Sequence, residues 1–193
     1  MNDKSTNPAK TQTNGLLWPL FEMAGELLDK QCEVSGSNHA DLTVLSLEQR
    51  VAFLLGCLIS QVRNGGWAWW VHNGYGLRLL ETRDAAQAVG GEQSEKVVAM
   101  LDDLRPEVDL TAEDRGFPGS YFIMTAEQEE LDDHDEAVET DGEWLCEIFD
   151  ERFDDFDEAL EQEINLWLAA RLPATESNPS LPVYLPGIEP AVK

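Results

Sequence analysis

The chain has 193 residues, of which 38 are acidic and 13 are Lys or Arg, so its formal net charge at neutral pH is −25. A surface with this charge repels nucleic acid and anionic membranes, and it attracts basic protein surfaces or cations. Because 42% of the residues are hydrophobic, the chain can bury a real core, which excludes wholesale disorder and fits one domain.

Cysteine usage and the length of the apolar runs indicate the compartment. Cys32, Cys57 and Cys146 are far apart and form neither a disulfide framework nor a CxxC zinc motif. Cys57 and Cys146 have apolar neighbours, where cysteine usually packs as a small hydrophobic residue. Residues 1–14 lack the apolar core of a signal peptide, and no apolar run is long enough to span a bilayer. We therefore expect a soluble cytoplasmic protein without membrane association.

Composition divides the chain into four regions. Residues 1–14 are polar and are expected to be disordered. Residues 15–45 should form an N-terminal helix and a loop, and residues 46–172 should form a helical domain. Residues 173–193 are rich in proline, which predicts an extended tail. A single compact domain with flexible ends is therefore expected.

Strong local signals mark the start and the end of the second helix. Ser46 and Gln49 have the spacing of a capping box, which predicts a helix start. The apolar face of this helix is wide, so the helix should lie centrally in the core. It should end at Asn64-Gly65-Gly66, because glycine reaches left-handed backbone geometry without steric cost.

Three tryptophans, Trp67, Trp69 and Trp70, follow this glycine pair directly. They could form a ligand platform, but tryptophans this close together are more often core packing. Two further helices are predicted over residues 77–89 and 94–104, each ended by glycine or proline.

The next segments are less regular. Residues 107–120 contain glycine and proline and should be a surface loop, whereas residues 121–138 should be helical. No segment shows sustained strand alternation, so the predicted fold class is all-α.

Residues 127–163 carry half of all the acidic residues and a single basic one, Arg152. Over residues 142–172, hydrophobic residues recur every three or four positions, which predicts one long acidic amphipathic helix. Its other face is almost entirely carboxylate, and neighbouring carboxylates on a helix cost roughly a few tenths of a kcal/mol per pair. Either burial of the apolar stripe offsets this repulsion, or the carboxylate row is itself the functional surface.

Catalytic and metal-binding motifs are missing from the sequence. The acidic clusters that begin at Asp133 and Asp150 lack the ligand positions and the glycine of an EF-hand loop. His39, His72 and His134 lack the spacing of a zinc site. Since no phosphate-binding loop and no nucleophile motif is present either, we expect no metal, no cofactor and no enzymatic activity.

The stretch 64–73 reads NGGWAWWVHN and resembles the NGGF-x-Q-[FY]-[FL]-x-N signature of the DNA mimic protein 19 family, a small bacterial family long described as a domain of unknown function. Residues 85–91 resemble the helix end before a glycine turn in that family, and residues 149–153 resemble its LD-x-x-F run. Trp69 stands where the family usually has Gln. The resemblance extends over roughly residues 46–172. The residues of the signature that are expected to shape the core turn are Asn64, Gly65, Gly66, Trp67, Trp70 and Asn73.

This resemblance implies an all-α fold, a homodimer and a surface whose carboxylates imitate DNA phosphates. Such a protein would regulate transcription by covering the DNA-binding face of a transcription factor or another nucleic-acid-binding protein, without binding nucleic acid itself. DNA affinity comes largely from Lys and Arg contacts to phosphates, so a rigid carboxylate row could replace the phosphates there. The expected contact residues are Glu147, Asp150, Glu151, Asp154, Asp155, Glu158 and Glu161, extended by Glu127, Glu129, Glu130, Asp132, Asp133 and Asp135.

Two other functions fit the sequence. An immunity or antitoxin-like protein could use the same acidic face to neutralise a basic toxin or nuclease. An enzyme with an unrecognised pocket would need a deep cleft near Trp67, Trp69 and Trp70, lined by a few polar groups.

Overall fold

The computed structural model describes residues 15–36, 40–109, 121–122 and 140–172, and this part of the chain is almost entirely helical. Short 3-10 helices lie at Leu42–Val44 (η1), Tyr75–Arg78 (η2) and Arg105–Glu107 (η3). The α-helices are α1 (Leu17–Ser35), α2 (Leu47–His72), α3 (Leu79–Val89), α4 (Glu92–Leu104), α6 (Asp141–Asp154) and α7 (Asp157–Arg171). The all-α prediction is confirmed.

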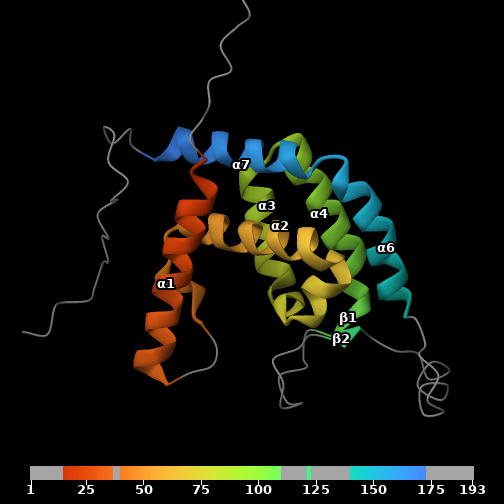
Figure 1. The fold of residues 1–193 in the computed structure, drawn as a ribbon, viewed down its shortest axis with the longest axis horizontal. Helices are drawn as coiled ribbons and strands as arrows, with labels where there is room; N and C mark the ends of the chain where they lie inside the picture. Colours follow the sequence, from red (N-terminus) through yellow and green to blue (C-terminus); the bar gives the residue numbers. More distant parts are fainter. Residues whose placement is uncertain (1–14, 37–39, 110–120, 123–139, 173–193) are drawn as a thin grey trace, which may run out of the picture.

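The helix α2 lies at the centre of the fold. It crosses the middle of the molecule in Figure 1, with α1 toward one end, α6 toward the other, and α7 running along the top. Val51, Leu55, Leu58 and Ile59 are fully buried, as the wide apolar face of this helix predicts. Because α2 contacts α1, α3, α6 and α7, it holds the other helices in place.

The start of α2 and the break within it follow the local sequence signals. Gln49 donates its backbone N–H to the Ser46 hydroxyl at 3.2 Å, and its side chain accepts from the Ser46 backbone N–H at 3.0 Å. Gly66, at φ 83° and ψ 177°, interrupts the helix, and helical geometry resumes at Trp67. The predicted capping box and the predicted break are both confirmed.

An aromatic cluster joins the second part of α2 to α6. The Trp67 ring lies edge-on to the rings of Trp70, Phe149 and Phe153, with ring centroids 5.6–6.0 Å apart. Trp67 and Trp70 are fully buried, which confirms the core-packing interpretation for these two residues. Trp69 is different, because 53% of it is exposed.

The long acidic helix predicted over residues 142–172 is in fact two helices, α6 and α7. Phe156 lies between them at φ −139° and ψ 1°, outside helical geometry. Phe156 is only 6% exposed, and its ring packs edge-on against that of Phe153, with the centroids 5.3 Å apart. The bend therefore keeps Phe156 in the core while α7 turns across the ends of other helices.

The structure also corrects the prediction for residues 107–138. Val108–Asp109 (β1) pairs antiparallel with Tyr121–Phe122 (β2), so Tyr121 and Phe122 begin a strand and not the predicted helix. Residues 110–120 and 123–139 lie outside the described part of the chain, as do residues 1–14 and 173–193.

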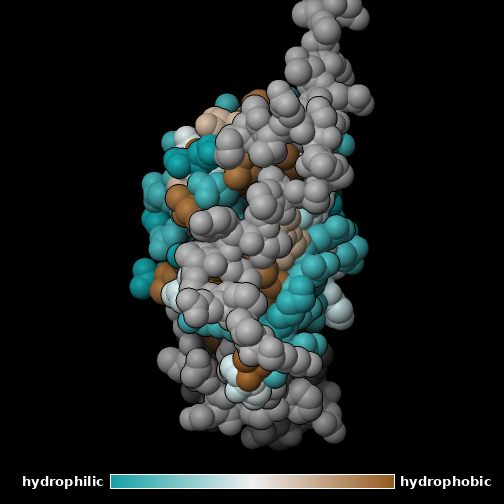
Figure 2. Space-filling view, turned by 90° about the vertical axis from the view of Figure 1, so that its left-hand side faces the viewer, coloured by the Kyte–Doolittle hydropathy of each residue, from teal (hydrophilic) through white to brown (hydrophobic). Residues whose placement is uncertain are grey.

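On the face shown in Figure 2, hydrophobic residues lie between hydrophilic ones in separate small areas. Among the described residues, none of the helices combines the length and the apolar character needed to cross a bilayer. Cys57 and Cys146 are buried with the core residues, as predicted.

Candidate protein-binding surface

Five carboxylates on the outer side of α6 and the start of α7 form the candidate surface. Within the described part of the chain, none of them makes an ion pair or a hydrogen bond. Residues three, four or seven apart on a helix share a face, so Glu147, Glu151 and Asp154 of α6 form one row. These outward carboxylates, all exposed, are Glu147, Glu151, Asp154, Asp155 and Glu158.

Asp150 does not belong to this row, because it points into the protein. Its Oδ1 accepts the backbone N–H of Trp67 at 2.8 Å, the first helical residue after the break in α2. Burial raises the pKa of Asp150, the charges of Asp154 and Glu147 raise it further, and the Trp67 N–H opposes this shift. Asp150 therefore caps a helix and is removed from the predicted contact residues.

The glycine before Trp67 makes room for this cap. A methyl group on Gly66 would collide with the Asp150 carboxylate. Gly66 also has a positive φ of 83°, which only glycine adopts easily. The NGG stretch and the FDERF stretch, 83 residues apart from Trp67 to Asp150, thus form one structural unit.

Glu161 is also engaged inside the protein. It accepts from the Trp18 indole N–H at 2.8 Å and from Nη1 of Arg63 at 3.0 Å. Arg63 also pairs through Nε with Asp157 at 2.6 Å. Because Arg63 pairs with both carboxylates and ties α7 to α2, Glu161 is also removed from the predicted contact residues.

Glu163, which sequence reasoning missed, caps α4. Its carboxylate accepts the backbone N–H groups of Gln93 at 3.1 Å and Ser94 at 2.9 Å. A methyl group on Gly91 would collide with this carboxylate. A glycine pair followed by a helix, with an acid on a distant helix to cap it, therefore occurs twice in this fold.

The second cap that α7 supplies is Asn165. Its Oδ1 accepts the backbone N–H groups of Leu16 at 2.6 Å and Leu17 at 2.9 Å, at the start of α1. Its Nδ2 donates to the Glu161 carbonyl at 2.8 Å. No sequence signal marks this role, since the residue lies 148 positions from its partner Leu17.

One aromatic side chain accompanies the outward carboxylates. Trp144 is 56% exposed and precedes Glu147 by three residues and Glu151 by seven, so it stands on the same face of α6. Beside it, Glu143 pairs with Nε2 of His72 at 3.4 Å. Sequence reasoning missed Trp144, although its spacing from Glu147 and Glu151 places it on the carboxylate face.

Other predicted site residues have different outcomes. The side-chain amide of Asn73 donates a hydrogen bond to Oε1 of Gln61 at 2.8 Å, which ties the C-terminal end of α2 to the part of the helix before the break. Among the described residues, no three His, Cys, Asp or Glu side chains gather where they could hold a metal ion. The predicted contact residues that lie outside the described residues are Glu127, Glu129, Glu130, Asp132, Asp133 and Asp135.

Comparison with known proteins identifies one family. A sequence model of a family described as DMP19-like protein matches residues 44–172, well over half of the chain. No curated protein and no solved structure matches. The matched range contains the glycine breaks, the aromatic cluster and the capping acids described above. The chain belongs to the family of DMP19-like proteins, the DNA mimic protein 19 family that its NGG stretch resembles.

Proposed function

We propose that this protein is a DNA mimic that binds the DNA-binding face of a transcription factor or another nucleic-acid-binding protein and keeps it from DNA. The observation that carries the proposal is the set of five outward carboxylates, which make no ion pair within the described residues. Family membership supports the same function. A basic groove built for phosphates can accept these carboxylates in their place.

The geometry of a helix makes such a row suitable. Carboxylates one helical turn apart are separated by about 5.4 Å along the helix axis, and the packed helix fixes that spacing. In a flexible acidic tail, the same charges would have to be ordered on binding, at a cost in conformational entropy. The aromatic cluster beneath α6 keeps its outer face in one orientation.

The test is a competition experiment. The partner is first captured from a lysate of the source organism on immobilised protein, with washes of rising salt, and identified. Its binding to a labelled DNA site is then measured with increasing amounts of this protein. Wild-type protein should displace the DNA, and displacement should weaken as salt rises.

A charge-neutral variant and a matched control locate the surface. The variant carries Glu151→Gln, Asp154→Asn and Glu158→Gln, and we expect it to lose most of the competition. The control carries Glu22→Gln, Glu26→Gln and Asp29→Asn, which removes the same charge from exposed positions on α1. We expect the control to compete like wild type. Equal competition by both variants would rule out the outward carboxylates as the binding surface.

The identity of the captured protein separates this function from its main alternative. If the protein retained at low salt is a toxin or a nuclease with no DNA site to regulate, the acidic face serves an immunity function instead.

We also propose that the protein acts in the cytoplasm as a homodimer, which the family resemblance supports. Light scattering should then give twice the chain mass of 21.6 kDa.

A further inference from the structure

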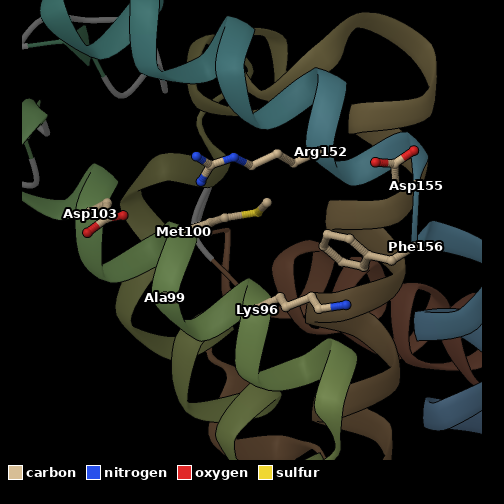
Figure 3. Close-up of a pocket in the computed structure, with 7 residues that line it drawn as sticks. All are labelled: Lys96, Ala99, Met100, Asp103, Arg152, Asp155 and Phe156. Carbon is tan, nitrogen blue, oxygen red and sulfur yellow. The ribbon is translucent and has the colours of Figure 1, made fainter.

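A cleft lies between α4 and the end of α6, beside the outward carboxylates (Figure 3). Its cavity volume is about 360 Å³, within the range of small-molecule sites in proteins. The floor is apolar and is made by Ala99 and Met100 of α4 and by Phe156 at the bend. Met100 is 5% exposed and Phe156 is 6% exposed, so the floor is fixed in the core.

Arg152 is the cationic group best placed to receive a ligand there. It is the one basic residue among the acids of residues 127–163, and in Figure 3 it extends from α6 across the cleft above Met100. Within the described residues, its guanidinium makes no ion pair or hydrogen bond. The Arg152 guanidinium is exposed above an apolar floor. Its paired N–H donors match the positions of the two oxygens of a carboxylate.

The second cation in the cleft is already engaged. The Nζ of Lys96 lies 5.3 Å from the centroid of the Phe156 ring, 3.3 Å from Glu92 and 2.8 Å from Gln93 Oε1. It therefore adds positive potential to the cleft, while Arg152 has its donors available.

Two acids at the ends of the cleft limit what can bind. Asp103 and Asp155 stand at opposite ends of the cleft in Figure 3, and neither pairs with Arg152. With two cations and two carboxylates, the lining has no net positive charge to attract a polyanion such as a nucleotide. The lining instead suits one negative charge on a small apolar body.

We propose that this cleft binds a small organic monocarboxylate with an aromatic or aliphatic body. The carboxylate pairs with Arg152, and the body lies on Met100 and Phe156. Of the outward carboxylates, Asp155 also lines this cleft, whereas the floor residues and Arg152 do not belong to that set.

The test is a titration of the full chain with phenylacetate, followed by NMR of methionine methyl groups labelled with carbon-13. The chain has four methionines, and the Met100 signal is assigned with Met100→Leu. We expect the Met100 signal to shift and saturate. Acetate, which lacks the apolar body, should bind more weakly, and citrate, a polyanion, should produce no saturable shift.

Two arginine variants decide the role of Arg152. Arg152→Gln should weaken phenylacetate binding about tenfold, the effect of losing a charge-assisted pair. Arg171→Gln is the control, because it removes the same charge from an exposed arginine that lies against Trp167 on α7. No saturable shift at Met100, unchanged affinity in Arg152→Gln, or citrate binding as tight as phenylacetate binding would each overturn the proposal.

Discussion

At the scale of single residues, the burial of Asp150 links stability to pH. Its pKa in the folded protein is raised, first by burial and then by Asp154 and Glu147. An acid with a raised pKa destabilises the fold while it is ionised. This cost is present above the folded pKa, and it disappears as the pH falls below the unfolded value near 3.8.

Two substitutions separate the charge of Asp150 from its capping role. Asp150→Asn keeps an oxygen that accepts the Trp67 N–H and removes the charge, so it should be at least as stable as wild type at neutral pH. Any gain should shrink as the pH approaches 3.8. Asp150→Ala loses the cap and should be about 1 kcal/mol less stable than Asp150→Asn. Urea unfolding monitored by circular dichroism measures both, and equal stability of the two variants would contradict the capping role.

Gly66 should tolerate substitution far less than other glycines with positive φ. Gly66→Ala adds a methyl group against the Asp150 carboxylate at a backbone geometry, φ 83° and ψ 177°, that is nearly restricted to glycine. We expect a loss of about 3 kcal/mol in the free energy of unfolding. Gly36→Ala is the control, because Gly36 also has positive φ but has open space around it, and it should cost about 1 kcal/mol. Similar losses at the two sites would argue against the Gly66–Asp150 contact.

At the scale of elements, α7 caps the N-terminal ends of two other helices in addition to packing against them. Neither α1 nor α4 has a side chain of its own that caps its first turn. Asn165 and Glu163 supply those acceptors from α7. The order of both helix starts therefore depends on where α7 lies.

Removing one of these caps should loosen a distant helix. Asn165→Ala leaves the N–H groups of Leu16 and Leu17 without their acceptor, which should cost about 1–2 kcal/mol. Hydrogen exchange should accelerate at these amides more than at the centre of α1. Gln162→Ala, at an exposed position on the same helix, is the control and should leave this exchange unchanged. Uniform acceleration over the whole chain would indicate global destabilisation instead of a lost cap.

At the scale of the whole molecule, a net charge of −25 acts on stability and on binding in opposite directions. Repulsion among the acids destabilises the compact state, whereas the same acids would attract a basic partner. Because the Debye length falls from about 30 Å at 0.01 M salt to about 10 Å at 0.1 M, salt weakens both effects.

The melting temperature should therefore rise with sodium chloride over this range, while the affinity for a basic partner falls. Thermal unfolding at several salt concentrations tests the first part. The variant Glu151→Gln, Asp154→Asn, Glu158→Gln should show a smaller rise than wild type. A melting temperature that does not change with salt would mean that the acids are too well solvated to repel each other.

Local chemistry in the sequence was sufficient to predict most of the fold. The capping box at Ser46 and Gln49, the helix end at Gly90 and the break at Gly66 depend on residues that are neighbours in the chain. Periodicity then places the apolar faces, and composition alone sets the acidic character. These features need no knowledge of which helices meet.

Only the tertiary structure decided which carboxylates face outward. Asp150, Glu161 and Glu163 look like their neighbours in sequence, but each meets a partner on a distant helix. The bend at Phe156 could not be predicted from the sequence either, because the spacing of apolar residues continues across it unchanged. Periodicity identifies the face of a helix on which a residue lies, whereas the role of a carboxylate depends on which N–H group or guanidinium the packing brings within hydrogen-bonding distance.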